Sequence, residues 1–146
     1  MGRSTAEVTI ERSADEVWAA IRDYGDPRWR GGIDSCVRQG DVRVVHTSGV
    51  VVEETELHRD EAARTFSYGV TGMTGATTFD LGDGRVVDLS TMVGHHRATM
   101  TVVPLGDDVA RVVYDLELDE GHDQTLAASS RQYQAVIERL KACLEG

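Results

Sequence analysis

Several features are scarce in this sequence, and each scarcity excludes a class of protein. The chain has 146 residues, and no apolar run approaches the length of a membrane span. Because a helix needs about 20 consecutive apolar residues to cross a bilayer, we expect no membrane insertion. The beginning of the sequence has no signal-peptide pattern, so we expect a cytoplasmic protein.

Positive charge is also scarce. The formal net charge is −10, whereas a protein that binds nucleic acid needs clustered Lys and Arg side chains. The same charge disfavours binding to an anionic membrane surface. We therefore expect no nucleic-acid partner.

Cysteine occurs only as Cys36 and Cys143, near opposite ends of the chain. One disulfide would be compatible with this count, but two reduced thiols are the expectation for a cytoplasmic protein. The sequence has no Cys-X-X-Cys motif and no phosphate-binding or dinucleotide-binding fingerprint. The adjacent His95 and His96 would point to opposite faces of a strand and cannot chelate together. We expect no metal and no other cofactor.

The first third of the chain begins with a strand and two short helices. Apolar and polar residues alternate from Thr5 to Arg12, which predicts a half-buried strand. Ser13 and Glu16 have the spacing of a capping box, which predicts the start of a helix. Asp26-Pro27 predicts the start of a second short helix, because an N-cap residue is followed by proline at the first helical position.

The rest of the chain is predicted to be a run of antiparallel strands and one long helix. The strands are expected at residues 33–39, 41–47, 50–58, 64–70, 95–103 and 109–118, with a loop over 69–75 and a hairpin formed by 77–81 and 85–92. From Asp123 to Leu144, apolar residues recur at steps of three and four, which predicts a helix. It is the only element long enough to cover the sheet. We therefore expect a single α+β domain over residues 1–146, in which a curved sheet grips this helix and leaves a cavity.

Five short motifs lie along the chain in a characteristic order. They are Ser13-Ala14-Asp15-Glu16-Val17-Trp18, Asp26-Pro27-Arg28-Trp29, Val42-Arg43-Val44-Val45, DEAARTFSY at residues 60–68, and Thr101-Val102-Val103-Pro104. Their order and spacing resemble the START/Bet v 1-like (SRPBCC) superfamily, and in particular its polyketide cyclase/dehydrase and lipid-transport branch. In that family a short loop usually joins the strands around Tyr68 and Ala98, whereas additional residues intervene here.

The resemblance implies both a fold and a kind of ligand. The fold is the helix-grip fold, a curved antiparallel β-sheet wrapped around a long C-terminal α-helix, with two short helices after the first strand and an internal cavity. The ligand is a hydrophobic small molecule, polyketide-like or lipid-like. The resemblance fixes no reaction, because catalysts and simple binders share this fold.

Two candidate groups for acid–base chemistry are a histidine and a pair of tyrosines. His96 shares a strand face with Ala98 and Met100, and a neutral imidazole can act as acid or base near neutral pH. The alternative is a core histidine bonded to a hydroxyl. Tyr68 and Tyr114 are predicted to face inward, where their hydroxyls would orient a ligand carbonyl or donate to an enolate. Packing of the two rings in the core is the alternative.

A buried carboxylate is the third candidate. Glu53 is predicted to face inward on an otherwise apolar strand face, where it would be a general base. Arg43 is its predicted partner. A β-bulge in this strand would instead turn Glu54 and Glu56 inward.

Large side chains are expected to line the ligand cavity. They are Tyr24, Trp29, Phe66, Met100, Tyr114 and Tyr133. Three functional hypotheses remain open: a carrier of a hydrophobic molecule, a cyclase, aromatase or dehydratase that uses the acid–base candidates, and a module that binds another protein. We expect a monomer or a homodimer.

Overall fold

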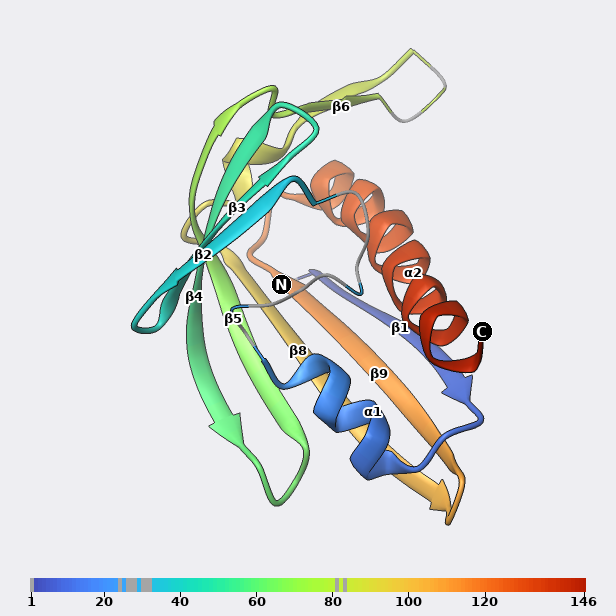
Figure 1. Ribbon diagram of the computed structural model, residues 1–146. Coiled ribbons are helices and arrows are strands. Elements are labelled where there is room, and N and C mark those ends of the chain that lie inside the picture. Colours follow the sequence, from blue (N-terminus) through green and yellow to red (C-terminus); the bar gives the residue numbers. More distant parts are fainter. Residues whose placement is uncertain (1, 24, 26–28, 30–32, 81, 83) are drawn as a thin grey trace.

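The structure is a computed structural model that describes residues 2–23, 25, 29, 33–80, 82 and 84–146. Its strands are β1 (Gly2–Ile10), β2 (Ser35–Gln39), β3 (Val42–Thr47), β4 (Val50–Asp60), β5 (Thr65–Gly75), β6 (Thr78–Asp80), β7 (Val86–Asp88), β8 (His96–Gly106) and β9 (Val109–Leu118). The helices are α1 (Ala14–Ile21), α2 (Asp123–Glu145) and the short 3₁₀ helix η2 (Leu89–Met92). Seven strands form one curved antiparallel sheet in the order β1-β9-β8-β5-β4-β3-β2, and β6 pairs with β7 in a second, small sheet (Figure 1). This is the expected helix-grip fold.

Helix α2 lies along one half of the main sheet. It packs chiefly on β1 and β9 (Figure 1). Its buried stripe includes Tyr133, Ile137 and Leu140, which repeat at steps of three and four. The inward residues of β9, among them Val112 and Tyr114, alternate with half-buried ones. The apolar core therefore lies between α2 and this half of the sheet.

Polar side chains of α2 also bind the main chain at the outer edge of β1. The contacts are Gln134 Nε2 to the Glu7 carbonyl (3.5 Å), Lys141 Nζ to the Thr9 carbonyl (2.7 Å), and the Glu11 amide to Glu145 Oε2 (2.8 Å). In an antiparallel strand the main-chain groups of alternate residues point to the same side. The three groups bound here all belong to odd-numbered residues. The helix thus provides partners for the side of β1 that faces away from β9.

Helix α1 begins at the predicted cap. Ser13 Oγ accepts a hydrogen bond from the Glu16 amide at 3.2 Å, and the Glu16 carboxylate accepts from the Ser13 hydroxyl instead of the Ser13 amide. Val17 and Ile21 are fully buried beneath the helix. The predicted start of the second short helix, Asp26-Pro27, lies outside the described residues.

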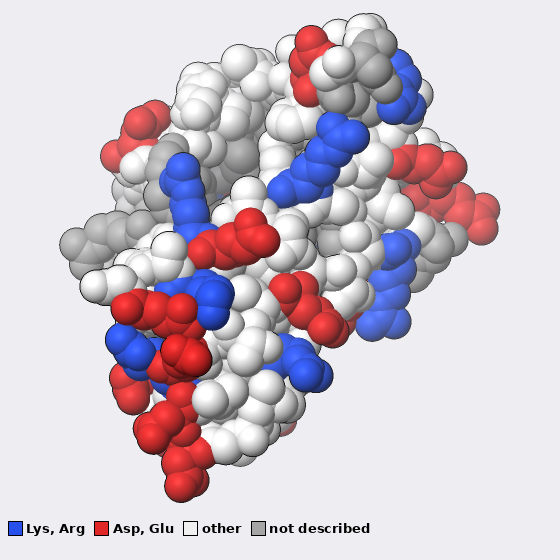
Figure 2. Space-filling model, turned by 90° about the vertical axis from the view of Figure 1, so that its right-hand side faces the viewer, with Lys and Arg blue, Asp and Glu red and all other residues white. Residues whose placement is uncertain are grey.

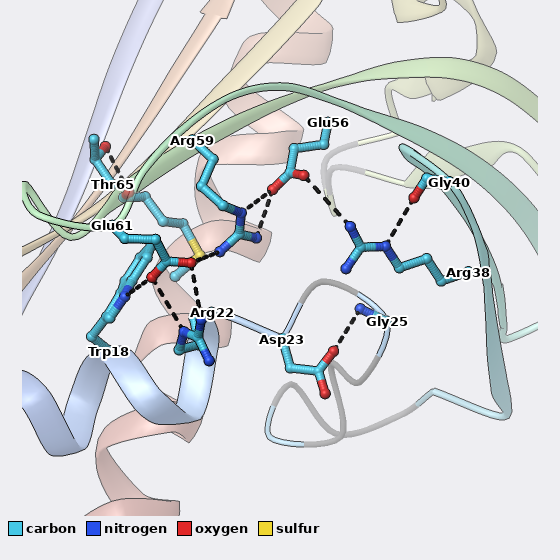
Figure 3. A network of polar contacts seen from close by, with 11 residues as sticks. Trp18, Arg22, Asp23, Gly25, Arg38, Gly40, Glu56, Arg59, Glu61 and Thr65 are labelled. Carbon is cyan, nitrogen blue, oxygen red and sulfur yellow. Dashed lines mark hydrogen bonds and ion pairs between the residues drawn. The ribbon is translucent and has the colours of Figure 1, made fainter.

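A network of ionic and hydrogen-bonded side chains ties α1 to the turn after β4 (Figure 3). Glu61, in that turn, accepts hydrogen bonds from the Trp18 indole at 2.7 Å and from the Arg22 guanidinium at 3.1 and 3.2 Å. Arg59 donates to Glu61 at 3.2 Å and to Glu56 at 2.7 Å. Hydrogen bonds from Arg22 and Trp18 lower the pKa of Glu61 to about 2.

The lowered pKa of Glu61 predicts a dependence of stability on pH. A carboxyl group whose pKa is lowered by folding contributes stability above its unfolded pKa, and this stability is lost as the pH falls through the folded pKa. For Glu61 the loss is expected between its ordinary value of 4.5 and about 2. Urea unfolding measured across this range should show a smaller pH dependence for Glu61→Gln than for the unaltered protein. Equal slopes for the two proteins would contradict the assignment.

Two expectations for the middle of the chain are wrong. The loop expected over residues 69–75 is strand, because β5 continues to Gly75 and pairs with β4 along this stretch. At Gly72 a Cβ atom would lie 2.7 Å from Glu53 Oε2, so the glycine leaves room for the Glu53 carboxylate to lie against β5. The second arm of the expected hairpin is shorter than predicted, since β7 ends at Asp88. There Asp88 accepts a hydrogen bond from the Ser90 amide at 3.0 Å and begins η2.

Three further expectations concern the surface charge, the two cysteines and the length of the helices. Acidic and basic side chains are interleaved over the face shown in Figure 2, where the described residues form no continuous basic strip. Cys36 is half-buried and Cys143 is exposed, and the two thiols are not joined. No helix within the described residues has the length and apolarity needed to cross a bilayer.

Candidate ligand cleft and buried polar cluster

A cleft of about 330 Å³ opens between α2 and the neighbouring strands β3 and β4. Because α2 packs on β1 and β9, its other flank faces these two strands across a space. The described residues that line the cleft are Ile33, Val45, Thr47, Val52, Glu54, Gln132, Ala135, Val136 and Arg139. Most of the wall is therefore apolar, with one buried carboxylate in it.

The buried carboxylate belongs to an ion pair between neighbouring strands. The β3–β4 register places Arg43 directly opposite Glu54. Arg43 Nε donates to Glu54 Oε1 at 2.8 Å, and the two side chains are only 5% and 7% exposed. A buried charge is tolerated when it is paired and hydrogen-bonded, and each member of this pair provides that for the other. Arg43, predicted to pair with Glu53, is buried and pairs with Glu54 instead.

The predicted inward position of Glu53 is wrong. Glu53 is exposed, and Glu54 is the buried carboxylate. The β4–β5 register shifts at Glu53/Glu54, where Thr71 of β5 is the extra residue, and at Glu56/His58, where Leu57 of β4 is the extra residue. The bulge at Leu57 changes which side chains of β4 face the core. Leu57, which strict alternation would place inside, is 52% exposed. The bulge considered as an alternative is the arrangement that the chain adopts.

Tyr68 and Tyr114 face each other in the core. Their hydroxyls are hydrogen-bonded, and each residue is 1% exposed. The Arg43 guanidinium carbon lies 5.1 Å from the centroid of the Tyr68 ring, within the range of a cation–π contact. The two tyrosines therefore combine packing with a hydroxyl pair that lies next to the Arg43–Glu54 ion pair.

His96 is bonded on both ring nitrogens. Its Nδ1 accepts from the Val70 amide at 3.3 Å, and its Nε2 lies 2.6 Å from the Tyr133 hydroxyl. Because Nδ1 is an acceptor, the ring is the neutral tautomer that carries its proton on Nε2 and donates it to Tyr133. The Tyr133 ring stacks on Tyr114 with centroids 4.2 Å apart. His96 is therefore a core histidine satisfied by a hydroxyl, the alternative weighed above.

The structure brings together most of the side chains expected in a site. Arg43, Tyr68, Tyr114, Tyr133 and His96 form one contiguous buried cluster with Glu54, which we call the polar cluster. Of these six residues, Glu54 is the one among the described residues lining the cleft. The cluster therefore meets the cleft at a carboxylate.

The other expected ligand contacts lie elsewhere. Phe66 and Met100 are 1% exposed and belong to the hydrophobic core, and half-buried Trp29 packs against that core. None of these three is among the described residues lining the cleft. Tyr24 lies outside the described residues.

Sequence reasoning missed the apolar wall of the cleft. Val45 and Val52 stand opposite each other in the β3–β4 register. The helix side of the wall consists of Gln132, Ala135, Val136 and Arg139. Their spacing of three, four and seven marks one helical face beside the buried stripe of α2. That spacing is the signal in the sequence that identifies this part of the wall.

Two other hollows are more polar. One of about 410 Å³ lies between β7 and the start of α2, and the other, of about 300 Å³, lies at the start of β8. The larger one has charged or polar residues such as Asp88, His122 and Asp123 in its wall. Small-molecule sites are mostly apolar with a few placed polar groups. The cleft beside Glu54 fits that description better, although it is not the largest by volume.

A curved antiparallel sheet around a long C-terminal helix, with a cleft between them, defines a helix-grip domain. Residues 1–145 match the family described as "Polyketide cyclase / dehydrase and lipid transport". The chain belongs to this family. No curated protein matches the sequence.

Solved structures share the fold at low sequence identity. An uncharacterized protein from Bacillus thuringiensis has a TM-score of 0.77 at 14% identity, with 99% of this chain and 100% of that chain covered. A START superfamily protein from Mycobacterium smegmatis has a TM-score of 0.70 at 13% identity, with 98% and 97% covered. A point mutant of norcoclaurine synthase from Thalictrum, in complex with a transition-state analogue, has a TM-score of 0.65 at 15% identity, with 99% and 94% covered.

Proposed function

We propose that this protein binds a hydrophobic small molecule, polyketide-like or lipid-like, in the cleft between α2 and strands β3 and β4. The observation that carries the proposal is the apolar wall of the cleft, in which Val45, Val52 and Val136 lie around a single buried carboxylate. Each methylene group buried there would contribute about 0.8 kcal/mol. The volume of about 330 Å³ is at the lower end for small-molecule sites. A compact ligand of one or two rings, or part of a longer chain, fits it best.

A substitution that fills the cleft should weaken binding. The neutral fluorescent probe N-phenyl-1-naphthylamine is expected to bind the unaltered protein with an increase in fluorescence. Val136→Phe places an aromatic ring where the ligand would lie. Because overfilling a packed site costs roughly 1–3 kcal/mol, this variant should bind the probe about tenfold more weakly, or more weakly still. Val103→Phe is the matched control, since Val103 is an exposed residue of β8 that does not belong to the cleft wall as described.

The outcome of this titration decides the proposal. Equal affinities for the two phenylalanine variants would place the probe elsewhere on the protein and contradict it. Native mass spectrometry of freshly purified protein gives an independent measurement, because a bound endogenous ligand adds its own mass to the chain.

A second candidate function is a cyclase or dehydratase, and the polar cluster is the observation that favours it. In this role Glu54, not Glu53, would remove a proton from the carbon next to a ligand carbonyl, which moves the electron pair onto the carbonyl oxygen as an enolate. A tyrosine hydroxyl from the Tyr68–Tyr114 pair would donate a hydrogen bond to that oxygen. Glu54, protonated in this step, would give that proton to a hydroxyl group, which leaves as water, while His96 would hold the Tyr133 hydroxyl beside Tyr114. This route requires the ligand to reach side chains that lie behind the cleft wall.

The two candidate functions differ in what a substitution of the cluster does. For a catalyst, Tyr114→Phe should lower the turnover of a poly-β-ketone substrate, followed by its ultraviolet absorbance, while substrate binding persists. For a carrier, no turnover is expected from the unaltered protein. His96→Ala with unchanged turnover would remove His96 from the mechanism.

A further inference from the structure

We propose that the ligand of the cleft is a neutral, largely apolar molecule that carries a hydroxyl or N–H group and donates it to the Glu54 carboxylate. The inference rests on the proposed function and adds the chemical class of the ligand. It comes from one unusual feature of the wall. A carboxylate that is almost entirely removed from bulk water borders a largely apolar space.

The geometry fixes Glu54 as an acceptor. Its side chain is 7% exposed and is held across the strands by Arg43 at 2.8 Å. Arginine keeps its charge in proteins, and that charge favours the ionised form of the neighbouring carboxyl group. An ionised carboxylate can only accept hydrogen bonds and has about four acceptor positions.

The other polar residues of the cleft do not select a ligand class in the same way. Thr47 and Gln132 can each donate or accept, so they accommodate either kind of group. Arg139 belongs to an exposed part of α2 and would favour an anion. The buried carboxylate of Glu54 opposes an anion inside the cleft, where the dielectric constant is lower than in water and charges interact more strongly.

A ligand without a donor is also disfavoured. When it enters, it covers the part of the carboxylate that is still exposed and provides no hydrogen bond in return. A molecule with the same shape and one donor avoids this cost. The ligand class that suits both the apolar wall and the carboxylate is therefore a neutral donor, such as a phenol, an alcohol or an amide N–H on a hydrophobic body.

Three probes of nearly the same shape test the inference on the unaltered protein. These are 2-naphthol, 2-methoxynaphthalene and 2-naphthoate, titrated at pH 7 by isothermal calorimetry. The first is a neutral donor, the second is the same ring system with its donor blocked, and the third is an anion. A hydrogen bond to a charged acceptor should make 2-naphthol bind about 10- to 100-fold tighter than 2-methoxynaphthalene. The anion should bind more weakly than 2-naphthol.

A paired substitution tests the role of Glu54 itself. The double variant Arg43→Met/Glu54→Met replaces the whole ion pair by apolar side chains, a change that buried pairs often tolerate. In this variant the preference for 2-naphthol over 2-methoxynaphthalene should fall to within about twofold, since the acceptor is gone. Glu53→Met is the matched control, because its carboxylate is the exposed neighbour in sequence. The control should keep the full preference.

The possible results separate the inference from the proposed function. Equal binding of 2-naphthol and 2-methoxynaphthalene, or tighter binding of 2-naphthoate, would overturn the inference and leave the cleft as a binding site. A preference that survives the double variant would also overturn it. If none of the three probes binds, the proposed function fails and the inference fails with it.

Discussion

Replacement of Arg43 by methionine is expected to lower the free energy of unfolding by about 3–5 kcal/mol, the range for breaking a buried ion pair by removing one partner. The reason is the charge that remains. Glu54 would keep a carboxylate in a site where its side chain is 7% exposed, without the guanidinium that now lies at 2.8 Å. The contact between Arg43 and the Tyr68 ring would be lost as well. Urea unfolding followed by far-ultraviolet circular dichroism measures the change.

Two control variants show whether the loss comes from the unpaired charge. Arg43→Met/Glu54→Met removes both charges and should recover most of the stability, to within about 1–2 kcal/mol of the unaltered protein. Arg3→Met removes an arginine whose side chain is 63% exposed and pairs with Asp115 at 3.3 Å. Exposed pairs contribute about 0–1 kcal/mol, so this change should be small. If Arg43→Met costs no more than Arg3→Met, the ion pair is not buried as described.

Ile137→Ala is expected to cost about 2–5 kcal/mol of unfolding free energy. Ile137 is fully buried at the centre of the face that α2 turns to the sheet. Removing three of its carbons leaves a space that the surrounding strands can fill only in part. The helix would be held less firmly, and the cleft, which has α2 as one wall, should bind N-phenyl-1-naphthylamine more weakly.

A graded series gives the controls for this prediction. Ile137→Val removes one methylene group and should cost about 0.5–1.5 kcal/mol. Leu105→Ala removes an apolar side chain that is 46% exposed in β8 and should change stability by no more than about 0.5 kcal/mol. Similar losses for Ile137→Ala and Leu105→Ala would contradict the docking of α2 on the sheet.

The long regular elements were predictable because their patterns repeat many times. The expected strand over residues 109–118 coincides with β9, and the expected helix from Asp123 to Leu144 differs from α2 by one residue. Strand β5 was predicted too short because its second half is rich in glycine, which is typical of loops. Pairing with β4 outweighs that local preference. Such pairing depends on a segment that is distant in sequence.

The bulge at Leu57 in β4 shows why the site was only partly predictable. Strict alternation assigns Glu53 and Leu57 to one face, and a single extra residue reverses the assignment for everything beyond it. The inward positions of Arg43, Tyr68, Tyr114 and His96 follow from alternation because their strands carry no bulge at those points. Whether an inward residue borders the cleft or the core depends on where α2 lies across the sheet. No local pattern contains that information.

The contacts between α2 and the outer side of β1 have a consequence for how molecules of this protein meet. An unpaired edge of a sheet is a template on which another chain can build a further strand, and proteins that leave it open tend to aggregate. Here Gln134 and Lys141 occupy main-chain carbonyls of β1, and Glu145 occupies an amide just beyond it. The C-terminal helix that forms one wall of the cleft thus also shields an edge of the sheet from intermolecular strand addition.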